Sequence, residues 1–235
     1  MAEVFPEPVC KACGDQGLLA EYGRGIDPAI NRRVMGSLSW IMRQKPAWLR
    51  EALPGYASLL IIYDPMQADA RTVREFLLES AQKLSAAETP PGRRVEIPVC
   101  YGAEFGPDLE FVARSHDLSP AQVIRLHCQP MYHVYVLGFT PGFPYLGGLP
   151  KELHTPRLPN PRIKVPAGSV GIAGGQTGIY SLDSPGGWQI IGRTPLGLFA
   201  PDRRNPFLLK PGDRLKFRPI TKPEYARLYK GELRP

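Results

Sequence analysis

The chain has 235 residues, of which 29 are Lys or Arg and 22 are Asp or Glu, so its formal net charge is +7, and 43% of its residues are hydrophobic. This hydrophobic share is typical of a globular protein and argues against a disordered chain. The basic residues are scattered, which argues against a nucleic-acid-binding protein and favours a small acidic ligand or an acidic partner. No stretch approaches about 18 apolar residues, which argues against a membrane protein.

The N-terminal residues lack a basic segment followed by an apolar one, so we expect no signal peptide and a cytoplasmic protein. Cys10 and Cys13 have the spacing of metal ligands, but no second pair completes a zinc site. Cys100 and Cys128 lie far apart in the sequence. We therefore expect reduced thiols and no bound metal.

Two amphipathic helices are predicted in the first half of the chain. Asp27 and Pro28 are typical of a helix start, and Pro46 is expected to end this helix. Its apolar residues recur at spacings of four, four and three: Ile30, Val34, Leu38 and Ile41. A second helix is predicted to begin at Asp69, with the apolar residues Val73, Phe76, Leu77 and Leu84 on one side.

Strands in this half are predicted at 17–22, 48–53, 57–63 and 93–99, with a hairpin turn at Pro54-Gly55 and a polar loop over 86–92. Together with the helices they give the order βαββαβ, which is the ferredoxin-like arrangement. No phosphate-binding glycine motif occurs here, so we expect a structural or partner-facing role.

The second half is predicted to be mainly β. Short helices are expected to begin at Pro107-Asp108 and at Ser119-Pro120. Short strands then follow between Gly- and Pro-rich turns, at 132–137, 168–173, 178–181, 189–192 and 214–218. Many short strands with regular turns indicate a closed barrel or a sandwich.

Two glycine-rich stretches, 138–148 and 165–180, dominate this half. Glycine permits tight turns and close backbone approach, and proline restricts φ. The first stretch also contains Phe139, Phe143 and Tyr145, which a flexible linker would not need. We predict an ordered loop that forms the wall of a groove, and the same aromatic residues would serve equally well as interface anchors.

Five further residues lie in or beside the glycine-rich strands: Gln176, Tyr180, Asp183, Trp188 and Arg193. A groove made of Gln, Arg, Tyr and Trp suits a small carboxylate or amide, because Arg binds carboxylates bidentately and Gln binds amides. Three of the five also have a structural interpretation: Trp188 as a core residue, Arg193 as an ion-paired residue and Gln176 as the cap of a turn.

No complete catalytic constellation is visible. Glu104 and Asp108 form a possible carboxylate pair, although a helix cap is the favoured role of Asp108. His127 lies on a helix face, where a core or rim histidine is more common than a base. His133 acts as a base only if it faces the groove. There is no G-x-S-x-G motif, so we expect that this chain alone is not a complete enzyme.

Several motif blocks are similar to the allophanate hydrolase subunit 1 and KipI family, and this resemblance spans nearly the whole chain. The blocks are residues 101–109, 137–148, 165–180, 184–188 and 191–195. The resemblance implies an α+β protein with a ferredoxin-like βαββαβ domain over 1–92 and a cyclophilin-like β-barrel domain over 93–235. A prolyl isomerase activity does not follow from such a fold.

The resemblance also implies a function. The chain would be the B subunit of a heteromeric, ATP-dependent 5-oxoprolinase, which opens 5-oxo-L-proline to L-glutamate together with A and C subunits. ATP would be used by the assembled complex and not bound by this chain, which suits the missing phosphate-binding motif. The alternative is a KipI-like inhibitor that binds a sensor histidine kinase; a lone amidohydrolase or prolyl isomerase is less favoured.

Site residues are carried over from the resemblance as expectations. Those expected to bind substrate are Gln176, Tyr180, Arg193, Arg162 and His127. Those expected at a groove or interface are Phe139, Phe143, Tyr145 and Trp188. Two positions depart from the family pattern, Ser181 and His133, and the second departure argues against His133 as a catalytic residue. The resemblance does not decide whether the groove lies within this chain or is shared with the C subunit.

Overall fold

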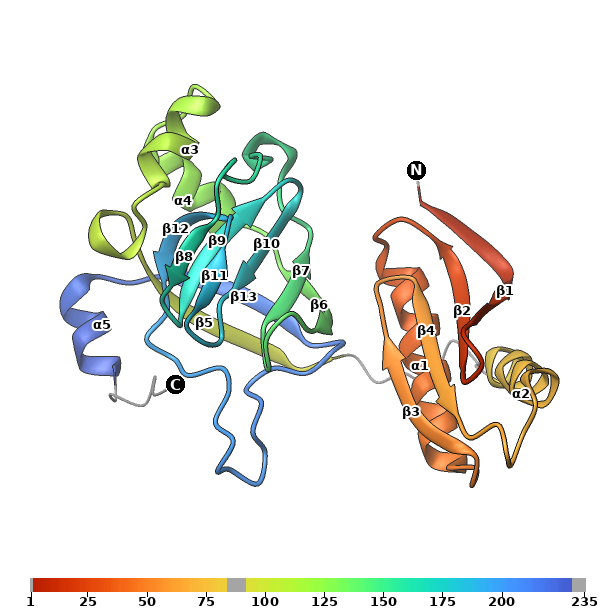
Figure 1. The fold of residues 1–235 in the computed structure, drawn as a ribbon. Helices are drawn as coiled ribbons and strands as arrows, with labels where there is room; N and C mark the ends of the chain where they lie inside the picture. Colours follow the sequence, from red (N-terminus) through yellow and green to blue (C-terminus); the bar gives the residue numbers. More distant parts are fainter. Residues whose placement is uncertain (1, 84–91, 230–235) are drawn as a thin grey trace. The chain divides into compact units, whose positions relative to one another are not determined.

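The computed structural model describes residues 2–83 and 92–229 (Figure 1). The chain divides into two compact units, 1–91 and 92–235, and each unit has its own hydrophobic core. The protein is a mixed α/β structure, in agreement with the predicted α+β class. No helix within the two described ranges is long and apolar enough to cross a membrane.

The first unit is a four-stranded antiparallel sheet with two helices packed on one face (Figure 1). Its strand order is β1-β2-β4-β3. The elements are β1 (Glu3–Cys13), β2 (Gly17–Arg24), α1 (Pro28–Gln44), β3 (Leu49–Pro54), β4 (Ser58–Tyr63) and α2 (Ala70–Gln82). Alternate residues of β2 and β4 meet the apolar faces of both helices and form the core.

Both predicted helix starts are confirmed by their caps. The Asp27 carboxylate accepts a hydrogen bond from Ala29 N at 2.7 Å, and the Asp69 carboxylate accepts one from Thr72 N at 2.8 Å. Helix α1 ends where Lys45 adopts a left-handed conformation (φ 47°), directly before Pro46. The loop predicted over 86–92 lies, apart from Gly92, outside the described residues, as does Leu84.

The predicted βαββαβ order is wrong in its last strand. Strand β5 (Arg94–Tyr101) belongs to the barrel of the second unit, where it pairs with β13 and β12. The sheet edge beside β2 is taken instead by β1, which the sequence analysis did not predict. Two prolines, Pro6 and Pro8, argue against a strand there, but an edge strand tolerates proline because one side of it makes no ladder bonds.

The second unit is built around a closed seven-stranded barrel, which decides between the predicted barrel and sandwich. Around the barrel the order is β10-β7-β6-β13-β5-β12-β9. These strands are β6 (Tyr132–Leu137), β7 (Pro144–Gly147), β9 (Ser169–Ala173), β10 (Gln176–Ile179), β12 (Gln189–Arg193) and β13 (Arg214–Pro219), together with β5. A separate two-stranded ribbon pairs β8 (Arg162–Val165) with β11 (Ser184–Gly186).

Three helices belong to the barrel unit (Figure 1). They are α3 (Leu109–Ser115), α4 (Pro120–Cys128) and α5 (Lys222–Leu228), and short 3₁₀ turns lie at Ala103–Phe105 and Lys151–Leu153. Helix α4 begins with a capping box, in which Ser119 N donates to Gln122 Oε1 at 2.7 Å and Gln122 N donates to Ser119 Oγ at 3.3 Å. The predicted starts of α3 and α4 are therefore confirmed to within two residues.

Candidate functional site

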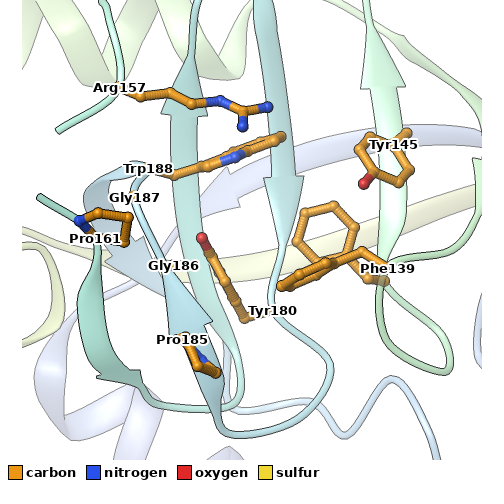
Figure 2. A pocket seen from close by; sticks show the side chains of 10 residues that line it. Phe139, Tyr145, Arg157, Pro161, Tyr180, Pro185, Gly186, Gly187 and Trp188 are labelled. Carbon is orange, nitrogen blue, oxygen red and sulfur yellow. The ribbon is translucent and has the colours of Figure 1, made fainter. Parts of the chain in front are cut away.

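An aromatic pocket of about 250 Å³ lies between the outer face of the barrel and the β8–β11 ribbon (Figure 2). Along the barrel strands that form its wall, side chains that face the pocket alternate with side chains that face the barrel core. The pocket is lined by Phe139, Phe143, Tyr145, Arg157, Pro161, Tyr180, Pro185, Gly186, Gly187 and Trp188. Five of these ten residues were predicted as groove or substrate-binding residues, and the structure brings them together.

Phe143 is the centre of the aromatic set. Its ring centroid lies 5.0 Å from that of Tyr145, 5.4 Å from Tyr180, 5.5 Å from Trp188 and 5.6 Å from Phe139, with interplanar angles of 60–89°. These tilted and edge-to-face contacts are the favoured geometry for aromatic pairs. Phe143 and Tyr180 are almost fully buried, whereas 61% of Phe139 is exposed.

Glycines let these rings lie directly on the backbone of the barrel, at Gly178, and of the ribbon, at Gly186. A Cβ atom on Gly178 would lie 2.9 Å from Phe143 Cζ and 3.0 Å from Trp188 Cζ3, which is closer than carbon atoms pack. A Cβ on Gly186 would clash with the Tyr180 hydroxyl oxygen. Close approach to the backbone, predicted from the glycine content, therefore has a specific purpose at both positions.

Arg157 is the one cationic side chain of the pocket lining. Its guanidinium carbon lies 5.9 Å from the centroid of the Trp188 ring, a cation–π contact that Figure 2 shows from the side. No carboxylate pairs with Arg157 in the described part of the chain, and the side chain is exposed. The pocket therefore combines apolar aromatic walls with a positive charge that is available to an anion.

The hydroxyl of Tyr180 is a candidate hydrogen-bond donor in the same pocket. Burial raises the pKa of Tyr180, and a hydrogen bond from the backbone N–H of Trp188 lowers it by a smaller amount. The hydroxyl therefore keeps its proton near neutral pH while its oxygen accepts from the backbone. Its proton remains available for a carbonyl oxygen of a ligand.

Phe139 reaches the pocket from a backbone conformation that is unusual for a bulky residue, with φ 62°. The turn is held by Thr140 N, which donates to Gly138 O at 2.7 Å, and by Phe143 N, which donates to Thr140 O at 3.0 Å. The Thr140 hydroxyl also lies 3.0 Å from that of Ser181. Ser181, one of the departures from the family pattern, thus contacts the loop that carries Phe139.

His127 does not reach the pocket. It is fully buried in the barrel, where its ring stacks on Phe217 at 4.4 Å. Thr177 Oγ1 donates to Gly171 O at 2.9 Å, so it must accept from His127 Nε2–H at 3.0 Å. Nδ1 is then unprotonated and accepts from the Tyr101 hydroxyl at 2.8 Å. Burial lowers the pKa of His127 to about 3, and with both ring nitrogens paired the side chain has a structural role.

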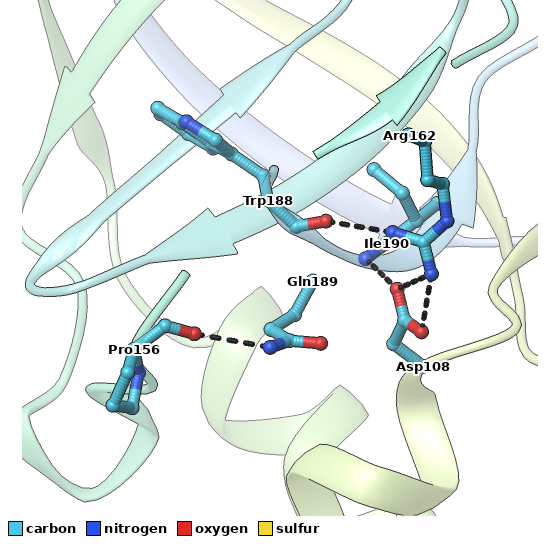
Figure 3. Close-up of polar contacts among 6 residues, drawn as sticks. All are labelled: Asp108, Pro156, Arg162, Trp188, Gln189 and Ile190. Carbon is cyan, nitrogen blue, oxygen red and sulfur yellow. Dashed lines mark hydrogen bonds and ion pairs between the residues drawn. The ribbon is translucent and has the colours of Figure 1, made fainter. Parts of the chain in front are cut away.

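Arg162 lies behind the pocket and pairs with a carboxylate. Its guanidinium contacts both Asp108 oxygens, at 2.7 and 2.8 Å, and donates to Trp188 O at 3.2 Å (Figure 3). The Asp108 carboxylate also accepts from Ile190 N at 2.6 Å. Asp108 precedes α3 as predicted, but its side chain makes no capping hydrogen bond, because these longer-range donors occupy it. Arg162 is therefore part of the support of the pocket and not of its lining.

Arg193 and Gln176 are also absent from the pocket lining. Arg193 ends β12 opposite Ser169, and its Nε is buried without a hydrogen-bond partner among the described residues. Gln176 begins β10, opposite Ala173, and is half-buried. The predicted substrate-binding set thus separates, because strand alternation and strand ends direct these side chains to different surfaces.

The remaining candidates have other surroundings. Glu104 pairs with Lys222 and does not contact Asp108. Cys10 and Cys13 lie three residues apart on β1 and so face opposite sides of the sheet; Cys10 packs against the core and Cys13 is exposed. His133 contacts the ring of Tyr135 at 4.6 Å.

Sequence reasoning missed Arg157, Pro161 and the Pro185–Gly187 segment as pocket residues. Residues 185–187 were noted only as part of a motif block of the family resemblance, and Arg157 stands in an irregular segment without periodicity. The available signal was an arginine among three prolines, Pro156, Pro159 and Pro161, because such a segment is rigid and can hold a charge in place.

Comparison with known proteins places this architecture in a family. Residues 8–209 match the model of the carboxyltransferase domain, subdomain C and D. The chain belongs to this family. The resemblance to the allophanate hydrolase subunit 1 and KipI group is thereby confirmed.

Two curated relatives carry the same name. The chain is 43% identical to the 5-oxoprolinase B subunit of Bacillus subtilis, over 90% of this chain and 92% of the relative. It is 44% identical to the 5-oxoprolinase B subunit of Escherichia coli O157:H7, over 89% and 95%. Among solved structures, TTHA0988 matches with a TM-score of 0.79 and 40% identity; the match covers 88% of this chain but spans only 40% of that longer one.

Proposed function

We propose that this protein is the B subunit of a heteromeric, ATP-dependent 5-oxoprolinase, which opens 5-oxo-L-proline to L-glutamate together with A and C subunits in the cytoplasm. The names of the two bacterial relatives support this role. Within the proposal, the barrel unit corresponds to a cyclophilin-like domain.

The observation that carries the proposal is the Arg157 guanidinium, which stacks on Trp188 at an aromatic pocket and has no carboxylate partner in the described part of the chain. 5-Oxo-L-proline is a five-membered lactam with a carboxylate. Its ring suits aromatic walls, its carboxylate suits Arg157, and its carbonyl oxygen suits the Tyr180 hydroxyl. A volume of about 250 Å³ lies below the roughly 300–1,000 Å³ typical of ligand sites, which favours a small acid.

The same pocket does not fit ATP. A triphosphate needs several cationic or backbone N–H donors, whereas the lining supplies Arg157 as its one cation. The sequence has no phosphate-binding glycine motif either. We therefore assign nucleotide binding to another subunit of the complex and the recognition of the cyclic acid to this chain.

Reconstitution tests the subunit role. ATP-dependent glutamate release from 5-oxo-L-proline is measured with this chain alone, with the A and C subunits added, and with this chain left out. Activity that requires all three subunits supports the proposal. Activity of the A and C subunits without this chain contradicts it.

Substitution of Arg157 tests the site. Because a hydrogen bond to a charged group contributes about 1.5–3 kcal/mol, we expect Arg157→Ala to weaken binding of 5-oxo-L-proline by roughly 10- to 100-fold, measured by calorimetry. Arg114→Ala is the matched control, since Arg114 is exposed on α3 away from the pocket lining. Equal affinities of the two variants would remove Arg157 from the site.

The alternative, a KipI-like inhibitor of a sensor histidine kinase, draws on a different observation. Phe139 is 61% exposed and also lines a second hollow, of about 450 Å³, with Leu137, Thr140 and Phe207. An exposed aromatic side chain between two hollows is a typical interface anchor. A silent reconstitution, combined with binding of this chain to a kinase that Phe139→Ala abolishes, would favour this alternative.

A further inference from the structure

The segment that carries Arg157, residues 155–162, is here called the Arg157 strap. Residues 156–161 have no regular secondary structure. The strap begins at Thr155, whose carbonyl accepts from Gly174 N at 2.7 Å. It ends at Arg162, the first residue of β8, which is tied to Asp108 and to Trp188 O. Both ends of the strap are therefore attached to the barrel unit.

Two hydrogen bonds fix the strap on either side of Arg157. The Gln189 side-chain amide donates from Nε2 to Pro156 O at 3.0 Å (Figure 3). Leu158 N donates to Gly187 O at 2.7 Å. Gly187 and Gln189 flank Trp188 in the sequence, so the two neighbours of Arg157 are bonded to the two neighbours of the residue on which it stacks.

A glutamine is unusual at position 189, because the position is buried. Its side chain is only 3% exposed, and its Oε1 is buried without a hydrogen-bond partner in the described part of the chain. A buried unsatisfied acceptor opposes folding, so an apolar residue of similar size would suit packing better. The one partner of the amide group is Pro156 O, which indicates that the amide is present for this contact.

We propose that Gln189 is a positioning residue: its donor to Pro156 O holds the Arg157 guanidinium against Trp188. An amide group at this position brings an acceptor, Oε1, together with the donor, Nε2. The donor bonds Pro156 O and the acceptor is left without a partner among the described residues. The part of this proposal that concerns ligand affinity rests on the proposed function; the part that concerns the position of Arg157 does not.

The position of Arg157 can be measured without any ligand. An arginine close to an indole face has side-chain proton resonances shifted by the ring current, and Arg157→Lys assigns them. We expect Gln189→Met to move the Arg157 Hδ and Hε resonances toward the values of an exposed arginine. Gln129→Met, an exposed position at the end of α4, is the matched control and should leave them unchanged. Unchanged Arg157 shifts in a folded Gln189→Met protein would overturn the proposal.

A second variant separates positioning from packing. Gln189→Glu keeps the shape of the side chain, and burial raises the pKa of the introduced carboxyl. When protonated, this group donates to Pro156 O as the amide does; when ionised, it repels that carbonyl. As the pH rises through the pKa of this carboxyl, we expect the Arg157 resonances to pass from wild-type to displaced positions. Wild-type positions at a pH at which the carbon resonance of the carboxyl shows it to be ionised would contradict a positioning role.

Ligand affinity gives the third measurement. If the pocket binds 5-oxo-L-proline, Gln189→Met should weaken binding by roughly five- to tenfold while the melting temperature changes little, because the orphaned acceptor disappears together with the donor. Wild-type affinity alongside displaced Arg157 resonances would contradict the proposed ligand contact and leave the positioning role standing. Unchanged affinity together with unchanged resonances would overturn the positioning role.

Discussion

The aromatic pocket and the surroundings of His127 are two regions of one barrel unit that both combine rings with polar groups, yet they differ in how those groups are satisfied. Around His127, the histidine nitrogens and the Tyr101 and Thr177 hydroxyls all have partners. In the pocket, the Arg157 guanidinium has an aromatic face but no carboxylate partner among the described residues. Unused bonding capacity at an accessible surface, and not residue type, therefore distinguishes a binding site from a polar core.

The largest effect is expected from a substitution in the polar core around His127. His127→Ala removes a fully buried ring and takes one hydrogen-bond partner from each of the Tyr101 and Thr177 hydroxyls. We expect a loss of about 3–5 kcal/mol in the free energy of unfolding, measured by urea denaturation. Where the variant is still folded, its affinity for 5-oxo-L-proline should be unchanged. A stable His127→Ala protein that has lost affinity would place His127 in the site after all.

Acid should weaken the same region through His127. Its folded pKa of about 3 lies below its ordinary value of 6.5, so this contribution to stability is complete above pH 6.5 and is lost as the pH falls toward 3. Within this window the loss approaches about 1.4 kcal/mol per pH unit. The pKa values of the neighbouring Tyr101, Tyr132 and Cys128 are raised by burial, so these groups stay neutral there.

His127→Gln isolates this effect, because it keeps hydrogen-bonding capacity but does not titrate. The difference in unfolding free energy between wild type and variant, followed by urea denaturation from pH 7 to pH 4, should shrink as the pH falls. A difference that does not vary with pH would show that the pKa of His127 is the same in the folded and the unfolded state.

Filling the floor of the pocket should have an intermediate effect. Gly178→Ala places a methyl group 2.9 Å from Phe143 Cζ and 3.0 Å from Trp188 Cζ3, so the rings must shift. We expect a destabilisation of about 1–3 kcal/mol and a changed Trp188 fluorescence spectrum. Gly138→Ala is the control, since its nearest contact would be an ordinary 3.7 Å to Tyr145. Equal effects at the two glycines would argue against close ring packing at Gly178.

The smallest expected effect concerns the loop that presents Phe139. Ser181→Ala removes the hydroxyl that lies 3.0 Å from that of Thr140. We expect a loss of about 0.5–1.5 kcal/mol in stability, measured by thermal unfolding, because one neutral hydrogen bond disappears. Ser115→Ala, where the hydroxyl bonds only the preceding helical turn, should cost less. The reverse order would mean that the Thr140 contact does not hold the loop.

Local chemistry explains which parts of the fold were predictable. The starts of α1, α2 and α4 follow from Asp27, Asp69 and Ser119, each of which caps a backbone N–H within three residues. The glycine-rich stretches and their aromatic residues correctly indicated an ordered wall, because close ring-to-backbone packing requires both residue types. Such signals act over a few residues and are therefore visible in the sequence.

The parts of the fold and of the site that were not predicted depend on strand pairing and side-chain contacts between residues far apart in the sequence. The alternation of residues 93–99 predicts a strand but not its partners, so only the structure shows that β5 joins the barrel and that β1 completes the first sheet. In the same way, His127 acquires its partners from residues 26 and 50 positions away, and Arg162 from Asp108, 54 positions away. The amino-acid sequence sets which side chains are available for a site. Their partners come from the tertiary structure: within the described residues, Arg157 has no carboxylate, whereas Arg162 pairs with Asp108 and both ring nitrogens of His127 are hydrogen-bonded. A side chain's bonding capacity is used by whichever groups the fold brings within reach.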